Sequence, residues 1–126
     1  MSVLRLQGER TWVLPTGQEE VQADEDGADV LPGRRVLAFW RIKSVASTST
    51  PSLALGFDHA PRILDPPEVG RYCDTSVTLA WVGTVSEPAT TMCDVSGNLG
   101  GRLRWRLKNT GANDATVVSD IYLVCR

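Results

Sequence analysis

Short segments in which apolar and polar residues alternate constrain the fold of this chain more than any other feature. In RLRWRLK, residues 102–108, the side chains of Leu103, Trp105 and Leu107 fall on one face of an extended strand and the basic residues fall on the other. No longer segment shows the apolar period of about 3.6 residues that marks a helix. The pattern predicts an all-β protein with an antiparallel β-sandwich or jelly-roll-like domain.

The other strand candidates are separated by turns rich in Gly, Pro and Asn. They cover residues 36–45, 52–57, 76–85 and 116–125. The segment HAPRILDPPEVGRY, residues 59–72, contains three prolines and is predicted to be a loop. NTGAND, from Asn109 to Asp114, is predicted to be a hairpin loop that pairs the last two strands with each other.

The first 35 residues differ from the rest of the chain. The segment LPTGQEEVQADEDGADVLPGRR is polar, acidic and interrupted by glycine and proline. We expect an extended N-terminal arm or long loop over residues 1–35, with one short strand from Val3 to Gln7, and a β-sandwich domain over residues 36–126. The aromatic residue of this arm, Trp12, together with Val13 and Leu14, is predicted to anchor the arm in a pocket of a partner.

A row of basic residues occupies one face of the strand at 102–108, namely Arg102, Arg104, Arg106 and Lys108. Such a row is either the solvated face of a sheet or a docking face for an acidic protein. The formal net charge of −2 argues against nucleic-acid binding, because nucleic-acid-binding domains are usually basic. On the docking interpretation, the acidic residues of the arm pair with this row on a neighbouring subunit. Those residues are Glu19, Glu20, Asp24 and Asp26.

The four tryptophans support two interpretations. Trp40, Trp81 and Trp105 lie on strand faces predicted to be buried, so we expect core packing. Tryptophans exposed together on one sheet face would instead indicate sugar stacking, and the sequence leaves both options open.

No catalytic, metal or cofactor site is predicted. The chain has one histidine, His59, and no G-x-S-x-G turn, so a hydrolase that uses His59 is the weakest alternative. DEDGAD, residues 24–29, resembles a calcium loop but lacks the closing glutamate of the twelve-residue pattern. Three cysteines without a C-x-x-C pair disfavour zinc. We expect reduced and largely buried thiols, and a Cys73–Cys93 disulfide stays open.

No apolar run approaches the roughly 20 residues that span a bilayer, so no membrane partner is predicted. The start of the sequence lacks the apolar stretch and cleavage site of a signal peptide, which indicates synthesis in a cytoplasm.

The C-terminal segment carries the phrase R-x-R-x-x-N-T-G-x-x-x-A-T-V, which begins at Arg104 and ends at Val117. It resembles the last two strands of small β-sandwich virion structural proteins of tailed bacteriophages and prophages. The residues that carry the resemblance are Arg104, Arg106, Asn109, Thr110, Gly111, Ala115, Thr116 and Val117. The resemblance implies a head decoration (cement) protein or a minor head or tail component, without an active site.

The sequence therefore predicts a non-enzymatic virion protein that stabilises a capsid. Its expected partners are the major capsid protein or other virion subunits and further copies of itself, for which the resemblance suggests a trimer. The alternative is a carbohydrate-binding β-sandwich module, for instance of a phage fibre.

Overall fold

The computed structural model describes residues 2–23, 26–30, 35–61, 73–95 and 101–126. Within these ranges the chain forms nine strands and no helix that could span a membrane. The strands are β1 (Ser2–Leu14), β2 (Glu19–Val21), β3 (Ala28–Val30), β4 (Val36–Ser47), β5 (Ser52–Pro61), β6 (Cys73–Val82), β7 (Ala89–Asp94), β8 (Gly101–Asn109) and β9 (Ala115–Cys125).

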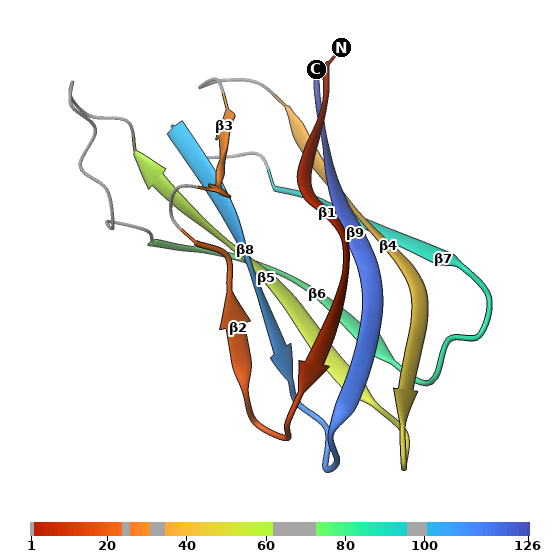
Figure 1. Cartoon of the computed structure of the whole chain (residues 1–126). Helices are drawn as coiled ribbons and strands as arrows, with labels where there is room; N and C mark the ends of the chain where they lie inside the picture. The colour runs from red at the N-terminus through yellow and green to blue at the C-terminus, as the bar shows by residue number, and fades with distance from the viewer. Residues whose placement is uncertain (1, 24–25, 31–34, 62–72, 96–100) are drawn as a thin grey trace.

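The strands form two antiparallel sheets that pack face to face (Figure 1). Sheet A has the order β1-β9-β4-β7. Sheet B has the order β2-β8-β5-β6, and β3 pairs with the same edge of β8 as β2, nearer the start of that strand. The two ends of the chain lie side by side, because Ser2 pairs with Cys125. The predicted all-β sandwich is confirmed.

Alternation within the strands places the core where the sequence predicts it. In β8, Leu103, Trp105 and Leu107 are fully buried, and the basic residues between them face outward. In the first half of β4, Val36, Ala38 and Trp40 point into the same core. Residues with side chains on one pleat face therefore pack between the sheets, as the period of two requires.

The first 30 residues do not form a separate arm, which corrects the predicted division at residue 35. β1 pairs along nearly all of β9, and β2 and β3 pair with β8. The predicted short strand at Val3–Gln7 is the beginning of a strand that runs through Leu14. Two register shifts interrupt β1, between Arg5 and Gln7 and between Gln7 and Arg10. These irregularities break the alternation that would have identified the strand from its sequence.

The connection at Asn109–Asp114 is also different from the prediction. It follows β8 and precedes β9 as expected, but β8 pairs with β5 in sheet B and β9 pairs with β1 and β4 in sheet A. The segment therefore crosses between the sheets and closes no hairpin. The side chain of Asn109 is completely buried in this crossing, where it donates to the carbonyl oxygens of Leu14 and Asn113 and accepts from the Gly111 amide, each at 2.9 Å.

Tryptophans dominate the core. Trp40 and Trp105 are fully buried as predicted, and the Nε1 of Trp40 donates to the Ser119 hydroxyl at 2.9 Å. Trp12 is 1% exposed, and its ring meets Trp105 edge-on with centroids 5.3 Å apart. Trp81 is half-buried against the core. The core interpretation of the tryptophans is therefore confirmed for two of the three predicted residues and extends to Trp12.

Candidate functional site

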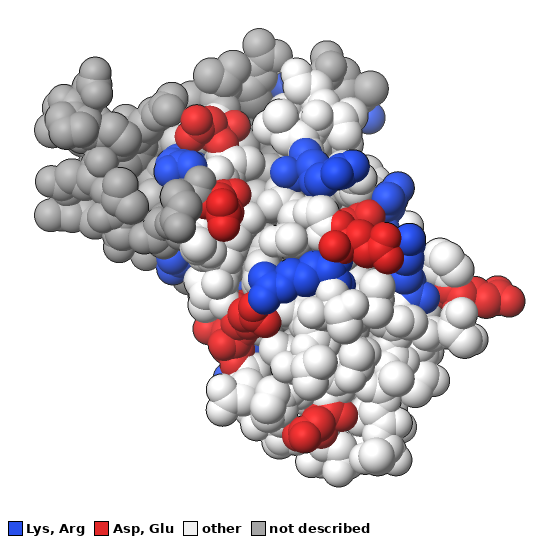
Figure 2. All heavy atoms as spheres, viewed as in Figure 1, with Lys and Arg blue, Asp and Glu red and all other residues white. Residues whose placement is uncertain are grey.

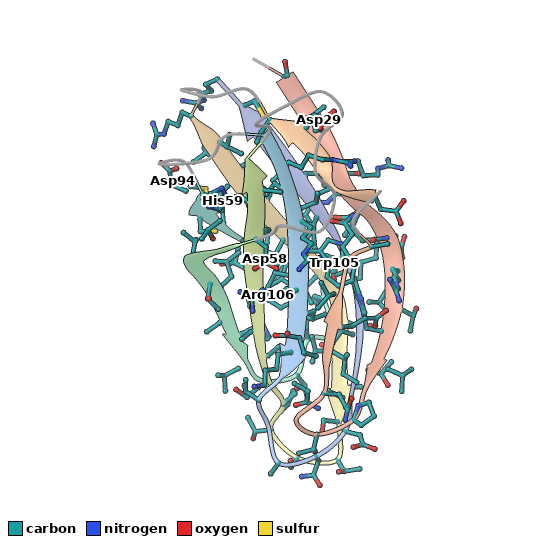
Figure 3. The ribbon with its side chains drawn as sticks, turned by 90° about the vertical axis from the view of Figure 1, so that its left-hand side faces the viewer. Asp29, Asp58, His59, Asp94, Trp105 and Arg106 are labelled. Atoms are coloured by element: carbon teal, nitrogen blue, oxygen red, sulfur yellow. The ribbon has the colours of Figure 1, made fainter. Side chains whose placement is uncertain are left out.

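The outer face of sheet B carries the predicted basic row. Arg102, Arg104 and Arg106 are half-buried, whereas Lys108 is exposed. Figure 3 views this side of the molecule and shows Arg106 of β8 beside Asp58 of β5. The alternation in the sequence correctly predicted that the basic residues share one outward face, and the structure shows that acidic side chains lie beside them.

Asp58 draws two of the arginines together. Its side chain accepts from the Nε of Arg104 at 3.1 Å and from the Nε of Arg106 at 2.7 Å, although only 4% of the residue is exposed. Gly56 provides the space, because a Cβ at this position would lie 2.8 Å from Nη2 of Arg106. A carboxylate held by two guanidinium groups is well compensated for its burial.

The acidic residues of β2 and β3 pair with the same basic row, within one chain. Glu19 lies 3.4 Å from Arg106, and Asp29 lies 3.4 Å from Arg102. Glu20 pairs with Arg10 of β1 across the edge of the sandwich. On the side seen in Figure 2, basic and acidic side chains are correspondingly interleaved. Glu19 and Glu20 therefore pair inside the molecule, and pairing of the predicted acidic residues with a neighbouring subunit stays a prediction.

The predicted partner anchor, Trp12 to Leu14, is also part of the sandwich. Trp12 and Leu14 point into the core and are 1% and 2% exposed, so they are not available to a partner of the folded chain. Val13 faces outward and is 70% exposed, and its role in partner binding stays a prediction. The same holds for Asp26 and Lys108, which are exposed, and Asp24 lies outside the described residues.

The outer face of sheet A carries a different set of side chains. In one row across all four strands, Arg5 of β1, Tyr122 of β9, Phe39 of β4 and Met92 of β7 lie directly opposite one another. Tyr122 and Phe39 are half-buried, and Met92 is 52% exposed. Directly opposed residues on one sheet face have Cβ atoms about 4.5–5.5 Å apart, so the two aromatic rings are neighbours.

A second apolar row lies beside the first, nearer the chain ends. It consists of Val3, Val124 and Leu37, and it ends at Asp94 on β7. Val3 is 60% exposed, whereas Leu37 is covered. Together the six apolar residues Val3, Leu37, Phe39, Met92, Tyr122 and Val124 form what we term the aromatic band.

Charged side chains border the aromatic band. The guanidinium carbon of Arg41, on β4, lies 4.6 Å from the centre of the Tyr122 ring. The guanidinium carbon of Arg5, on β1 at the other side of β9, lies 5.6 Å from the same ring centre. Arg41 also donates to both oxygens of Asp120 at 2.8 Å, and this hydrogen-bonded carboxylate raises the pKa of the guanidinium above its usual value. Beyond the second row, Arg35 and Arg126 are joined by two backbone hydrogen bonds, in which the amide of each donates to the carbonyl oxygen of the other.

The remaining candidates show no catalytic arrangement. His59 lies on β5 opposite Leu103, so residues 59–61 of the predicted loop belong to a strand. Residues 62–72 of that prediction lie outside the described residues. Among the described residues, no group of three or more His, Cys, Asp or Glu side chains could hold a metal ion. Cys93 is a free, half-buried thiol; burial and, to a lesser extent, the charge of Asp94 raise its pKa to about 11. The side chain of Cys73 lies outside the described part.

Comparison with known proteins adds information about the fold. No protein-family model and no curated protein matches the sequence. Among solved structures, the chain is similar to the CBM22-1 xylan-binding domain from Paenibacillus barcinonensis Xyn10C, with a TM-score of 0.53 and 13% sequence identity. The match covers 98% of this chain and 92% of that domain. At this identity the likeness shows a shared β-sandwich fold, which extends over the whole chain.

Sequence reasoning missed the aromatic band. Phe39 and Tyr122 are 83 positions apart, and only the pairing of β4 with β9 brings them together. A signal was present in the outward positions of both segments, where apolar residues recur although the opposite face already forms the core.

Proposed function

We propose that this chain is a non-catalytic carbohydrate-binding β-sandwich and that the aromatic band of sheet A is its binding face. The observation that carries the proposal is the pair of neighbouring, half-buried aromatic rings, Tyr122 and Phe39, on the outer face of sheet A. The similarity to a xylan-binding domain supports the choice of ligand class, since the folds correspond over nearly the entire chain.

The chemistry of the band suits a sugar chain. A pyranose ring has apolar C–H faces and a rim of hydroxyl groups. The apolar faces can pack on Tyr122 and Phe39, because aromatic side chains offer rigid surface at a low cost in conformational entropy. Arg41, whose side chain is 53% exposed, provides charged donors at the edge of the same surface, which hydroxyl groups can use, while the carboxylate of Asp120 is buried against it.

The dimensions of the face also fit an extended polymer. Three steps between neighbouring strands separate Arg5 from Met92, which gives a row of roughly 14 Å at about 4.8 Å per step. In the second apolar row, Val3 and Val124 add accessible width at about 6.7 Å from the first row, whereas Leu37 is covered. A surface of this shape can accept several sugar units lying flat, without a deep pocket.

The outer face of sheet B is a weaker candidate. Its described outward positions carry no aromatic residue, and its arginines are engaged with Asp58, Glu19 and Asp29. A ligand there would have to compete with ion pairs that hold β2 and β3 in place.

The test is titration of the full chain with soluble polysaccharides, xylan first, by calorimetry and affinity electrophoresis. Tyr122→Ala and Phe39→Ala are expected to weaken binding roughly threefold to tenfold each, since an aromatic contact contributes about 0.5–1.5 kcal/mol beyond its buried area. Val82→Ala, at a 67% exposed position on sheet B, is the matched control. Absence of binding across the polysaccharide panel, with the chain shown to be folded, would reject the proposal.

The virion interpretation, with its capsid partner, its trimer and its location, remains a prediction that these observations do not test. Its motivating feature, an arm free to reach a neighbour, is replaced by strands of the sandwich.

A further inference from the structure

We infer that the polysaccharide bound by the aromatic band is anionic and carries carboxylate groups along its length, as a polyuronate does. This inference rests on the proposed function and specifies its ligand. The evidence is the distribution of charge around the band, which differs from that of the rest of the chain.

Two of the bordering cations lack an acidic partner within the described residues. Arg5 and Arg126 are exposed, and neither is paired with a carboxylate in the part of the chain that the structure describes. The one contact of the Arg5 guanidinium found there is with the ring of Tyr122. Exposed guanidinium groups next to an apolar surface are ready to receive planar carboxylates in bidentate geometry.

The other two cations are paired yet accessible. Arg35 lies 3.2 Å from Asp94, with 59% of its side chain exposed, and Arg41 pairs with Asp120 while 53% of its side chain stays exposed. The Arg35–Asp94 pair is exposed on both sides and contributes little stability, so a ligand carboxylate can share this guanidinium group at small cost. Asp120 is buried, so Arg41 can offer a ligand only the N–H groups that Asp120 does not use.

The local charge balance has the opposite sign to that of the whole chain. Among the described residues, four arginines and two aspartates border the aromatic band, and the Lys43–Glu9 ion pair near Arg41 adds no net charge. The formal excess is two positive charges, whereas the chain as a whole carries −2. The arginines also lie on both sides of the band. Alternation places Arg35 and Arg126 one outward position beyond Leu37 and Val124, and Arg41 one outward position beyond Phe39.

This arrangement matches a polymer that presents apolar ring faces and carboxylates together. The ring faces would cover Tyr122 and Phe39, and the carboxylates would reach the arginines at the borders. A neutral polysaccharide would use the rings but would leave the positive excess without a counter-charge. An acidic peptide or an anionic membrane also supplies negative charge, but neither offers the flat, repeating apolar faces that the row of rings fits.

The experiment compares an acidic polymer with its neutral ester on the same backbone, and both with a neutral polysaccharide. The full chain is titrated with polygalacturonate, with the same polymer after complete methyl esterification, and with neutral xylan. We expect polygalacturonate to bind at least tenfold more tightly than its ester at low salt. Binding of the acid form should weaken several-fold on raising NaCl to about 0.3 M, since salt screens exposed charges.

Matched variants assign the effect to this face. Arg5→Gln combined with Arg126→Gln should weaken polygalacturonate binding roughly fivefold to twentyfold and weaken binding of the ester by less than about twofold. Lys108→Gln removes one exposed cation from the outer face of sheet B and should change neither. Thermal unfolding of each variant checks that the fold is retained.

The outcomes separate the two proposals. Equal binding of polygalacturonate and its ester overturns the anionic ligand and leaves the carbohydrate function standing. No binding to any of the three polymers, by a chain that is folded, overturns both. Equal binding of polyglutamate or of vesicles containing anionic lipid overturns the polysaccharide and indicates an acidic protein or a membrane surface.

Discussion

The buried amide of Asn109 provides the sharpest test of the sheet-to-sheet crossing. Its Nδ2 donates to the carbonyl oxygens of Leu14 and Asn113, and its Oδ1 accepts from the amide of Gly111. One side chain thereby joins the end of β1 in sheet A to the connection that leaves β8 in sheet B. In a simple hairpin turn this side chain would be exposed, whereas here it is 0% exposed.

Two substitutions at this position have different expected costs. Asn109→Ala removes three hydrogen bonds, each with a net contribution of about 1 kcal/mol, and leaves their partners without the amide, so the free energy of unfolding should fall by about 3 kcal/mol. Asn109→Asp keeps nearly the same shape and the acceptor for Gly111. It replaces the amide donor by a charged oxygen that faces two carbonyl oxygens, so it should be more destabilising than alanine at pH 7.

The pH dependence of the aspartate variant follows from the same geometry. Burial beside carbonyl oxygens favours the neutral acid, so the folded-state pKa of the introduced carboxyl lies above the unfolded value of about 3.9. The folded state then binds more protons than the unfolded state in that interval. The penalty relative to wild type should therefore shrink as the pH falls from 7 through the folded pKa.

Urea unfolding followed by tryptophan fluorescence measures these costs, because Trp12, Trp40 and Trp105 become exposed on unfolding. Asn113→Ala is the control: the carbonyl of residue 113 remains, and only an exposed side-chain contact with Ser49 is lost, so the change should be below about 1 kcal/mol. An Asn109→Asp variant as stable as wild type at pH 7 would refute the assigned hydrogen bonds.

Three further predictions test the burial, the ion pairs and the thiol. Trp12→Ala should lower the free energy of unfolding by about 3–5 kcal/mol, while Val13→Ala should lower it by less than about 1 kcal/mol. Equal small effects would contradict the burial of Trp12 and favour a mobile N-terminal arm. Asp58→Asn should cost about 2–3 kcal/mol, because Arg104 and Arg106 lose their shared carboxylate, against less than about 1 kcal/mol for the more exposed Asp29→Asn; comparable losses in urea unfolding would contradict the central role of Asp58. Since its pKa is raised to about 11, Cys93 should stay protonated at pH 8, and its alkylation rate, followed by peptide mass spectrometry, should rise about tenfold per unit from pH 8 to 10; a plateau below pH 9 would contradict the shift.

The sequence was sufficient for the fold class and for the faces of the regular strands. Alternation in RLRWRLK separates Leu103, Trp105 and Leu107 from the basic residues, and the structure has the same division. A side-chain period of two is a local property, so it can be read without knowing which strands are neighbours.

Strand pairing could not be read in this way. The turn-forming residues of Asn109–Asp114 identify a reversal of the chain, but a reversal within one sheet and a crossing to the other use the same residue types. The full length of β1 could not be predicted from the sequence for a related reason. Its apolar residues Leu4 and Leu6 are separated from Trp12 and Leu14 by a charged, irregular stretch that interrupts the alternation.

The candidate site depends on pairing even more strongly. The basic row of β8 was visible in the sequence because its members are close along the chain. The aromatic band draws its members from β1, β4, β7 and β9, so no local pattern contains it. The sequence left open that tryptophans stack against sugars, but three of the four are buried in the core. The rings that reach the surface are a tyrosine and a phenylalanine.

The different roles of the two faces follow from the position of the acidic segment in the chain. β2 and β3 run along the edge of β8, where Glu19 and Asp29 meet the basic row, and Asp58 meets it from β5. In the described part of the chain, no acidic segment of this kind pairs with the edges of sheet A, and Glu9 of its edge strand β1 is paired with Lys43. Its Asp94 and Asp120 are outnumbered by the arginines around the aromatic band, and β1, its edge strand, adds a further cation at Arg5. The basic row predicted from the sequence is thus balanced within the molecule, and the positive excess among the described residues lies beside the half-buried rings of Tyr122 and Phe39.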